Sequence, residues 1–172
     1  MKTHVATFRP VLLVSSFAIL IFISTAAAFL KPDFSGEWAI DEAKSNRGEF
    51  GGRMTAGKLS VKKEGEVMIV VRNATGPMGE VVTTDKITLD GKESPSTGGM
   101  EGSVRKTTSK LSDDQNTITV STATTLNFNG TTFNVAVAEV WSLSADGKTL
   151  TIDSESNTQM GVNKAKLVYN KL

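Results

Sequence analysis

Hydrophobic and polar side chains alternate along most of residues 117–152, a pattern typical of half-buried β-strands. The alternation stops at the dipeptides Asn129-Gly130 and Asp146-Gly147. Such dipeptides favour tight hairpins, because a type I′ turn requires positive φ at both of its central residues. The stretch therefore predicts three consecutive antiparallel strands joined by short turns.

A two-residue turn at Asn129-Gly130 also fixes the register of the first hairpin. The pairs that it predicts are Phe128–Thr131, Leu126–Phe133, Thr124–Val135, Thr122–Val137, Val120–Glu139 and Ile118–Trp141. This pairing brings the apolar positions of both strands onto one face, as a half-buried sheet requires.

A second indication of register is an internal similarity. Residues 111–120, LSDDQNTITV, resemble residues 143–152, LSADGKTLTI, and each segment reads as strand end, tight turn and strand start. If the two are equivalent, Leu111 and Leu143 both face inward. Counting by twos predicts the further inward residues Arg105, Thr107, Ser109, Ile118, Leu150, Ile152, Ser154, Ser156 and Thr158.

The predicted inner face changes in polarity along the strands. It is apolar near the turns at Asp113 and Asp146, and toward the other end hydroxyl groups are mixed with valines. A small barrel with a packed floor and a solvated mouth would show this gradient.

The other segments continue the rhythm of short strands and turns. Residues 34–40 alternate, with Phe34, Gly36, Trp38 and Ile40 on one face. Further strands are predicted at 59–63, 67–72, 80–89, 103–111 and 164–171. Residues 41–57 read as a long loop, with room for one helical turn, that is either a functional lid or simply mobile. Residues 92–102 read as a flexible segment at an open rim.

No long helix is predicted, so the fold class is all-β: an antiparallel up-and-down β-barrel of about eight to ten strands. A barrel is favoured over an open sheet because closure removes exposed strand edges.

Residues 1–28 read as an export signal, with Lys2 and Arg9 before an apolar core at 11–23 and small residues at 25–28. The alternative is an uncleaved membrane anchor, but the apolar core is short for a span of ~20 residues. We therefore expect a single domain over 29–172 that is periplasmic or secreted and touches the membrane only before cleavage.

Removal of the signal changes the available chemistry. His4 is the only histidine and the chain has no cysteine, so the mature chain has neither imidazole nor thiol. This excludes Cys nucleophiles, His bases and ordinary zinc sites, and no cofactor or metal is expected. The net charge becomes −1, with 17 Lys and Arg against 18 Asp and Glu, so nucleic acid is not an expected partner. A monomer is expected.

Several of these residues resemble the calycin superfamily, the lipocalin and fatty-acid-binding type of barrel. Gly36-Glu37-Trp38 resembles its Gly-x-Trp motif, and residues 167–171, LVYNK, are similar to the last strand of fatty-acid-binding proteins. Residues 38–45 and 143–150 also resemble exported bacterial lipocalin-like proteins of unassigned function. The resemblance implies a calycin-like barrel closed at one end by Trp38, with room for a cavity.

This sequence also departs from that family. Fatty-acid-binding proteins hold the ligand carboxylate with an Arg two residues before the terminal Tyr, and here that position is Leu167. Of these two family residues only the tyrosine has a counterpart here, and the resemblance implies that Tyr169 acts as a hydroxyl donor. Residues 41–57 offer no convincing counterpart of the helix pair that covers those barrels. A fatty-acid carrier is therefore not implied.

Two charged residues are predicted to face the interior. Glu139 lies among apolar neighbours, where a carboxylate is costly unless it is paired. The alternatives are a β-bulge that turns it to solvent and a structural bond to Tyr169. Arg105 should lie about 13 Å from the level of Glu139, at ~3.4 Å per residue, too far for a direct ion pair. It could meet an anionic ligand head or, as we favour, extend to water.

The leading hypothesis is a barrel that binds a small apolar or amphiphilic molecule. The predicted ligand-binding residues are Arg105, Val120, Thr122, Thr124, Val135, Val137, Glu139, Ser154 and Tyr169. The alternative is a structural or protein-interaction module with a filled core. An enzyme would depend on Glu139 or Tyr169, and the sequence shows no second carboxylate placed to assist. No catalytic residue is therefore assigned.

Overall fold

The structure, a computed structural model, describes residues 32–49, 55–76, 79–98, 103–128 and 130–172. The predicted export signal at 1–28 lies outside the described residues. In the described part, ten antiparallel strands form a closed barrel, which confirms the predicted all-β, up-and-down architecture. Within this part, no helix has both the length and the apolarity needed to cross a membrane.

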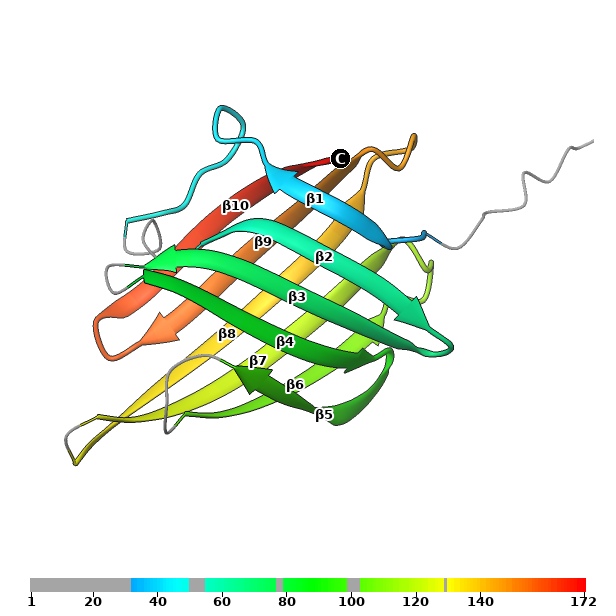
Figure 1. Ribbon diagram of the computed structural model, residues 1–172. Helices are drawn as coiled ribbons and strands as arrows, with labels where there is room; N and C mark the ends of the chain where they lie inside the picture. The colour runs from blue at the N-terminus through cyan, green and yellow to red at the C-terminus, as the bar shows by residue number, and fades with distance from the viewer. Residues whose placement is uncertain (1–31, 50–54, 77–78, 99–102, 129) are drawn as a thin grey trace, which may run out of the picture.

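Each strand pairs with its neighbours in the chain, and β1 pairs with both β2 and β10 to close the barrel. In Figure 1, β2, β3 and β4 cross the front of the view while β7 and β8 run diagonally behind them. The strands are β1 (Gly36–Ile40), β2 (Ala56–Glu64), β3 (Val67–Gly76), β4 (Gly79–Thr88), β5 (Asp90–Gly98), β6 (Val104–Leu111), β7 (Thr117–Phe128), β8 (Thr131–Leu143), β9 (Thr149–Thr158) and β10 (Gly161–Lys171).

The register of β7 and β8 agrees with the prediction at every pair, from Ile118 opposite Trp141 to Phe128 opposite Thr131. Gly130 in the connection has a φ of +77°. The prediction succeeds because a two-residue turn sets which residues of the two strands are paired. Only this pairing places the apolar residues of both strands on the same face of the sheet.

The two similar segments form turns with the same hydrogen bonds. The backbone N–H groups of Ser112 and Ser144 donate to the carbonyls of Thr117 and Thr149, each at 2.9 Å. In return, the N–H groups of Thr117 and Thr149 donate to the serine hydroxyls at 3.0 and 2.9 Å. The repeat seen in the sequence is therefore a repeat in structure.

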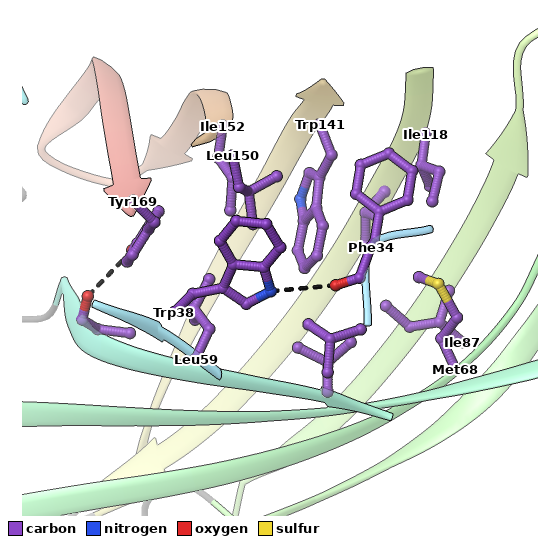
Figure 2. Packing of buried hydrophobic residues seen from close by; sticks show 14 of the residues in the cluster. Phe34, Trp38, Leu59, Met68, Ile87, Ile118, Trp141, Leu150, Ile152 and Tyr169 are labelled. Carbon is purple, nitrogen blue, oxygen red and sulfur yellow. Dashed lines mark hydrogen bonds between the residues drawn. The ribbon is translucent and has the colours of Figure 1, made fainter. Parts of the chain in front are cut away.

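A cluster of buried side chains fills the closed end of the barrel (Figure 2). The largest fully buried residues are Trp38, Trp141 and Tyr169. The indole N–H of Trp38 donates to the carbonyl of Phe34 at 3.0 Å, and the Phe34 ring lies 6.4 Å from that of Trp141. These aromatic residues form a packed floor, as the apolar end of the inner face predicted.

Gly36 provides room where β1 and β10 meet. A Cβ at this position, with its φ of +141°, would lie 2.6 Å from Cε of Lys171. The ammonium group of Lys171 lies 5.2 Å from the centre of the Trp38 ring. The space at Gly36 therefore admits a side chain of β10 that covers the floor tryptophan.

The prediction of a flexible segment at 92–102 is wrong for most of its length, because β5 covers residues 90–98. Residues 99–102 lie outside the described residues. β5 pairs with β6 at positions such as Ser94 opposite Thr107, and the buried Ser94 hydroxyl lies 3.2 Å from that of Thr88. A strand forms here because the closed barrel supplies partners that the polar local sequence does not indicate.

The segment 41–57 is described outside 50–54. Its described part begins with a turn, in which the N–H of Lys44 donates to the carbonyl of Asp41 at 3.2 Å. Asn46 then bridges to Lys166 through two backbone hydrogen bonds of 2.7 Å. The described part of this segment is thus attached to β10.

Candidate functional site

A cavity of about 420 Å³ lies inside the barrel. Its wall includes eight of the nine predicted residues: Arg105, Thr122, Thr124, Val135, Val137, Glu139, Ser154 and Tyr169. The ninth, Val120, is fully buried in the floor cluster. The alternation of the strands therefore brings most of the predicted set together in one place.

The barrel interior becomes more polar immediately above the floor. On neighbouring strands β8 and β9, Trp141 lies opposite Ile152, and one step further Glu139 lies opposite Ser154. Both strands direct every second residue inward, so each step toward the mouth adds another layer of side chains. The interior therefore has an apolar, filled floor, and the cavity above it is lined by charged, hydroxyl-bearing and aliphatic side chains.

Four charged side chains form a continuous chain across the interior, which we call the charged quartet: Glu139, Arg72, Asp85 and Arg105. Arg72 donates to both carboxylate oxygens of Glu139, at 3.2 and 2.7 Å. Its Nε lies 3.4 Å from Oδ2 of Asp85, whose Oδ1 lies 3.1 Å from Nη1 of Arg105. Because β3 and β8 lie on opposite sides of the barrel, the bond between Arg72 and Glu139 spans its interior.

The charged quartet rests on the aromatic floor. The indole N–H of Trp141 donates to Oε2 of Glu139 at 2.9 Å, and the guanidinium of Arg72 lies 5.2 Å from the centre of the Trp141 ring. The four side chains are between 1% and 16% exposed. Burial of these charges is tolerable because each has an opposite charge beside it.

The electrostatic environment keeps Arg72 charged and Tyr169 neutral. Burial opposes the charge on Arg72, but the carboxylates of Glu139 and Asp85 outweigh this effect and raise its pKa. Burial raises the pKa of Tyr169 to about 12. The Tyr169 hydroxyl donates to the carbonyl of Ala56 at 3.0 Å, so its proton is already used within the protein.

The structure corrects two expectations about the interior charges. Arg105 and Glu139 form no direct pair, as predicted, but they are connected through Arg72 and Asp85. The favoured interpretation that Arg105 extends to water is wrong, because its side chain is 14% exposed and paired with Asp85. The expectation that no second carboxylate lies near Glu139 is also wrong, because Asp85 lies on the other side of Arg72.

Glu139 is held in the regular ladder opposite Val120, so the β-bulge alternative is wrong. Its hydrogen-bond partners are Arg72 and Trp141, whereas the alternative proposed Tyr169. The carboxylate therefore faces the interior, as the register predicted.

Sequence reasoning missed Arg72 and Asp85. Both follow the period of two: Arg72 is in phase with the buried Val70, and Asp85 with the buried Ile87. The signal at Arg72 is masked because residues 67–71, VMIVV, are apolar in both phases. On β4 the alternation of apolar and polar residues is also unclear, because the apolar Val82 faces outward while the charged Asp85 faces inward.

Neither a metal site nor a comparison with known proteins assigns a function to the cavity. Within the described residues, no group of three or more His, Cys, Asp or Glu side chains is arranged to hold a metal ion. Comparison of the chain with known protein families, curated proteins and solved structures finds no match. The chemistry of the cavity is therefore the basis for assigning a function.

Proposed function

We propose that this protein binds a small apolar or amphiphilic molecule inside its barrel. The observation that carries this proposal is the interior cavity of about 420 Å³, whose lining surface is more apolar than polar although many of its residues carry hydroxyl or charged groups. Pockets for small molecules typically measure about 300–1,000 Å³ and combine an apolar lining with a few fixed polar groups. The apolar part of the ligand would lie against Val135, Val137 and Leu167, which line the cavity.

Two alternatives receive less support. A purely structural module with a filled core would need side chains to occupy the volume that the cavity holds. An enzyme acting through Glu139 and Asp85 would need one of them free to move a proton. Both carboxylates instead face guanidinium groups, an arrangement that fixes charges within the wall.

We propose further that the chain is an exported, calycin-like barrel. The closed ten-stranded up-and-down topology and the buried Trp38 on the first strand support this relationship. Terminal sequencing of the protein from its native host should find a new N-terminus following Ala28. A chain that retains residues 1–28 would contradict the cleavage.

The binding function can be tested without knowing the ligand. Protein purified from its native host is extracted with organic solvent, and the extract is analysed by mass spectrometry. The emptied protein is then titrated with the uncharged fluorescent probe N-phenylnaphthylamine. We expect a co-purifying amphiphile and saturable binding of the probe at one site per chain. The absence of both would count against the proposal.

A matched pair of variants tests whether binding occurs inside the barrel. Val135 lines the cavity, whereas Val140 on the same strand faces outward and is 43% exposed. Val135→Trp should fill part of the cavity and weaken probe binding about tenfold or more, since the ligand would lose much of its volume. Val140→Trp should leave probe binding unchanged. Equal effects of the two substitutions would show that the probe binds elsewhere.

A further inference from the structure

The positive charges of the charged quartet are already balanced by the protein. Arg72 lies between Glu139 and Asp85, and Arg105 faces Asp85. With two guanidinium and two carboxylate groups, the quartet has no net charge. Transfer of an ion out of water is costly unless an opposite charge meets it. A ligand carboxylate or ammonium group in the cavity would therefore add a charge that the quartet does not compensate.

The remaining described cation on the cavity wall is balanced in the same way. Arg47, the other described cation on the cavity wall, forms an ion pair with Glu42. Each guanidinium on the described wall thus faces a carboxylate of the protein itself.

The quartet nevertheless has hydrogen-bond donors to offer. The arginine side chain carries five N–H donors, and Arg105 directs Nη1 and Nη2 toward Asp85 at 3.1 and 3.4 Å. Among the described residues, Nη1 of Arg105 is buried and lacks a hydrogen bond of good geometry. Arg105 lies on the cavity wall opposite Thr124. Its side chain is 14% exposed, so a carbonyl, ether or hydroxyl oxygen of a ligand could accept a hydrogen from the part that faces the cavity without disturbing the charge balance.

We infer that the ligand is an uncharged amphiphile whose polar end accepts hydrogen bonds at the Arg105 side of the quartet. The inference rests on the proposed binding function and specifies its ligand class. The uncharged polar end accepts from Arg105, while the apolar part lies against the aliphatic side chains of the cavity wall, such as Val135 and Val137.

The first test compares ligands with the same tail and different head groups. Decanol, decanoate and decylammonium compete with N-phenylnaphthylamine for the wild-type protein near neutral pH. The affinity for decanol should be at least about tenfold higher than that for either ion, because a buried unpaired charge is unfavourable. Decanoate binding as tight as that of decanol would overturn the inference and leave the binding function intact. Failure of the probe itself to bind would overturn both.

The second test changes the charge of the quartet. Asp85→Asn and Glu139→Gln each leave one uncompensated positive charge, so the ratio of decanoate to decanol affinity should rise about tenfold. Arg105→Gln leaves a negative charge, and decylammonium should then gain. Glu139→Gln preserves the shape of the side chain, so it carries the test even if Asp85→Asn fails to fold.

Matched controls separate the cavity from the overall charge of the protein. Asp153 and Glu155 are exposed on β9, so Asp153→Asn and Glu155→Gln change the net charge by the same amount outside the barrel. The ratio of decanoate to decanol affinity should stay at the wild-type value in both. A shift equal to that in Glu139→Gln would overturn the inference, because the total charge would then set the preference.

Discussion

Tyr169 is the only tyrosine in the chain, and burial raises its pKa from the usual 10.0 to about 12. An unfolded tyrosine releases its proton at pH ~10. Between pH 10 and about 12 the folded state therefore binds more protons than the unfolded state, and stability falls as the pH rises. The loss attributable to Tyr169 should reach about 2–3 kcal/mol.

Two measurements check this prediction. The tyrosinate absorbance of the folded protein should appear near the raised pKa of Tyr169. Urea unfolding of the wild type and of Tyr169→Phe at several alkaline pH values should show a steeper loss of stability in the wild type. Parallel curves for the two proteins would argue against a raised pKa in the folded state.

Arg72 supports a second prediction at the scale of single residues. Arg72→Met would leave Glu139 and Asp85 buried without their shared cation, and breaking a buried pair in this way costs about 3–5 kcal/mol. Lys106→Met is the matched control, because Lys106 forms an ion pair with Glu93 in which both side chains are more than half exposed. Such a pair should contribute less than about 1 kcal/mol. Urea unfolding that shows similar losses in both variants would contradict the structural role of the quartet.

At the scale of elements, the two equivalent turns differ at one informative position. Gln115 and Gly147 occupy the same place in the repeat, and their φ values are +59° and +67°. This conformation strains a residue that has a Cβ, but not glycine. Gln115→Gly should therefore stabilise the protein by about 0.5–1 kcal/mol, and Gly147→Gln should destabilise it by a similar amount.

Thermal unfolding of the two single variants and of the double exchange checks this prediction. A Cβ at Gly147 would meet no atom within 4 Å, so any loss in Gly147→Gln reflects backbone conformation and not a clash. The double exchange should return close to the wild-type stability. A destabilised Gln115→Gly variant would show that the Gln115 side chain contributes more than the strain removes.

The elements also show how far local sequence patterns reach. The β7–β8 hairpin and the two related turns were predictable because each depends on residues close together in the chain. The strand β5 and the residues Arg72 and Asp85 were not, because their environment comes from strands far apart in sequence. The cavity wall was largely predictable on β7, β8 and β9, where apolar and polar residues alternate. On β3 the residues 67–71 are apolar in both phases, so the inward position of Arg72 is hidden.

At the scale of the whole molecule, two ladders of the closed barrel have only three pairs each, β4–β5 and β1–β10. The β1–β10 ladder is extended by backbone hydrogen bonds from Asp41 to Val168 and from Leu172 to Glu37, which leaves β4–β5 as the weaker one. The β4–β5 pairing joins only residues 83–85 to 96–98, whereas β7 and β8 are paired from Thr117 to Phe128. The ion pair between Asp85 on β4 and Arg105 on β6 reaches past β5 and so holds the strands on either side of it together. Local opening requires little free energy where few buried contacts and hydrogen bonds must break. We therefore expect the barrel to open first at β5.

Hydrogen exchange followed by mass spectrometry tests this prediction on the intact protein. Peptides from β5 should exchange faster than those from β7 and β8. Arg105→Gln should accelerate exchange in β4 and β5 about tenfold or more, because the connection past β5 is lost, while β7 and β8 change little. Lys106→Met removes only the exposed pair between β6 and β5 and should have a much smaller effect. Acceleration spread evenly over all strands in Arg105→Gln would mean that the ion pair stabilises the whole barrel and not this ladder.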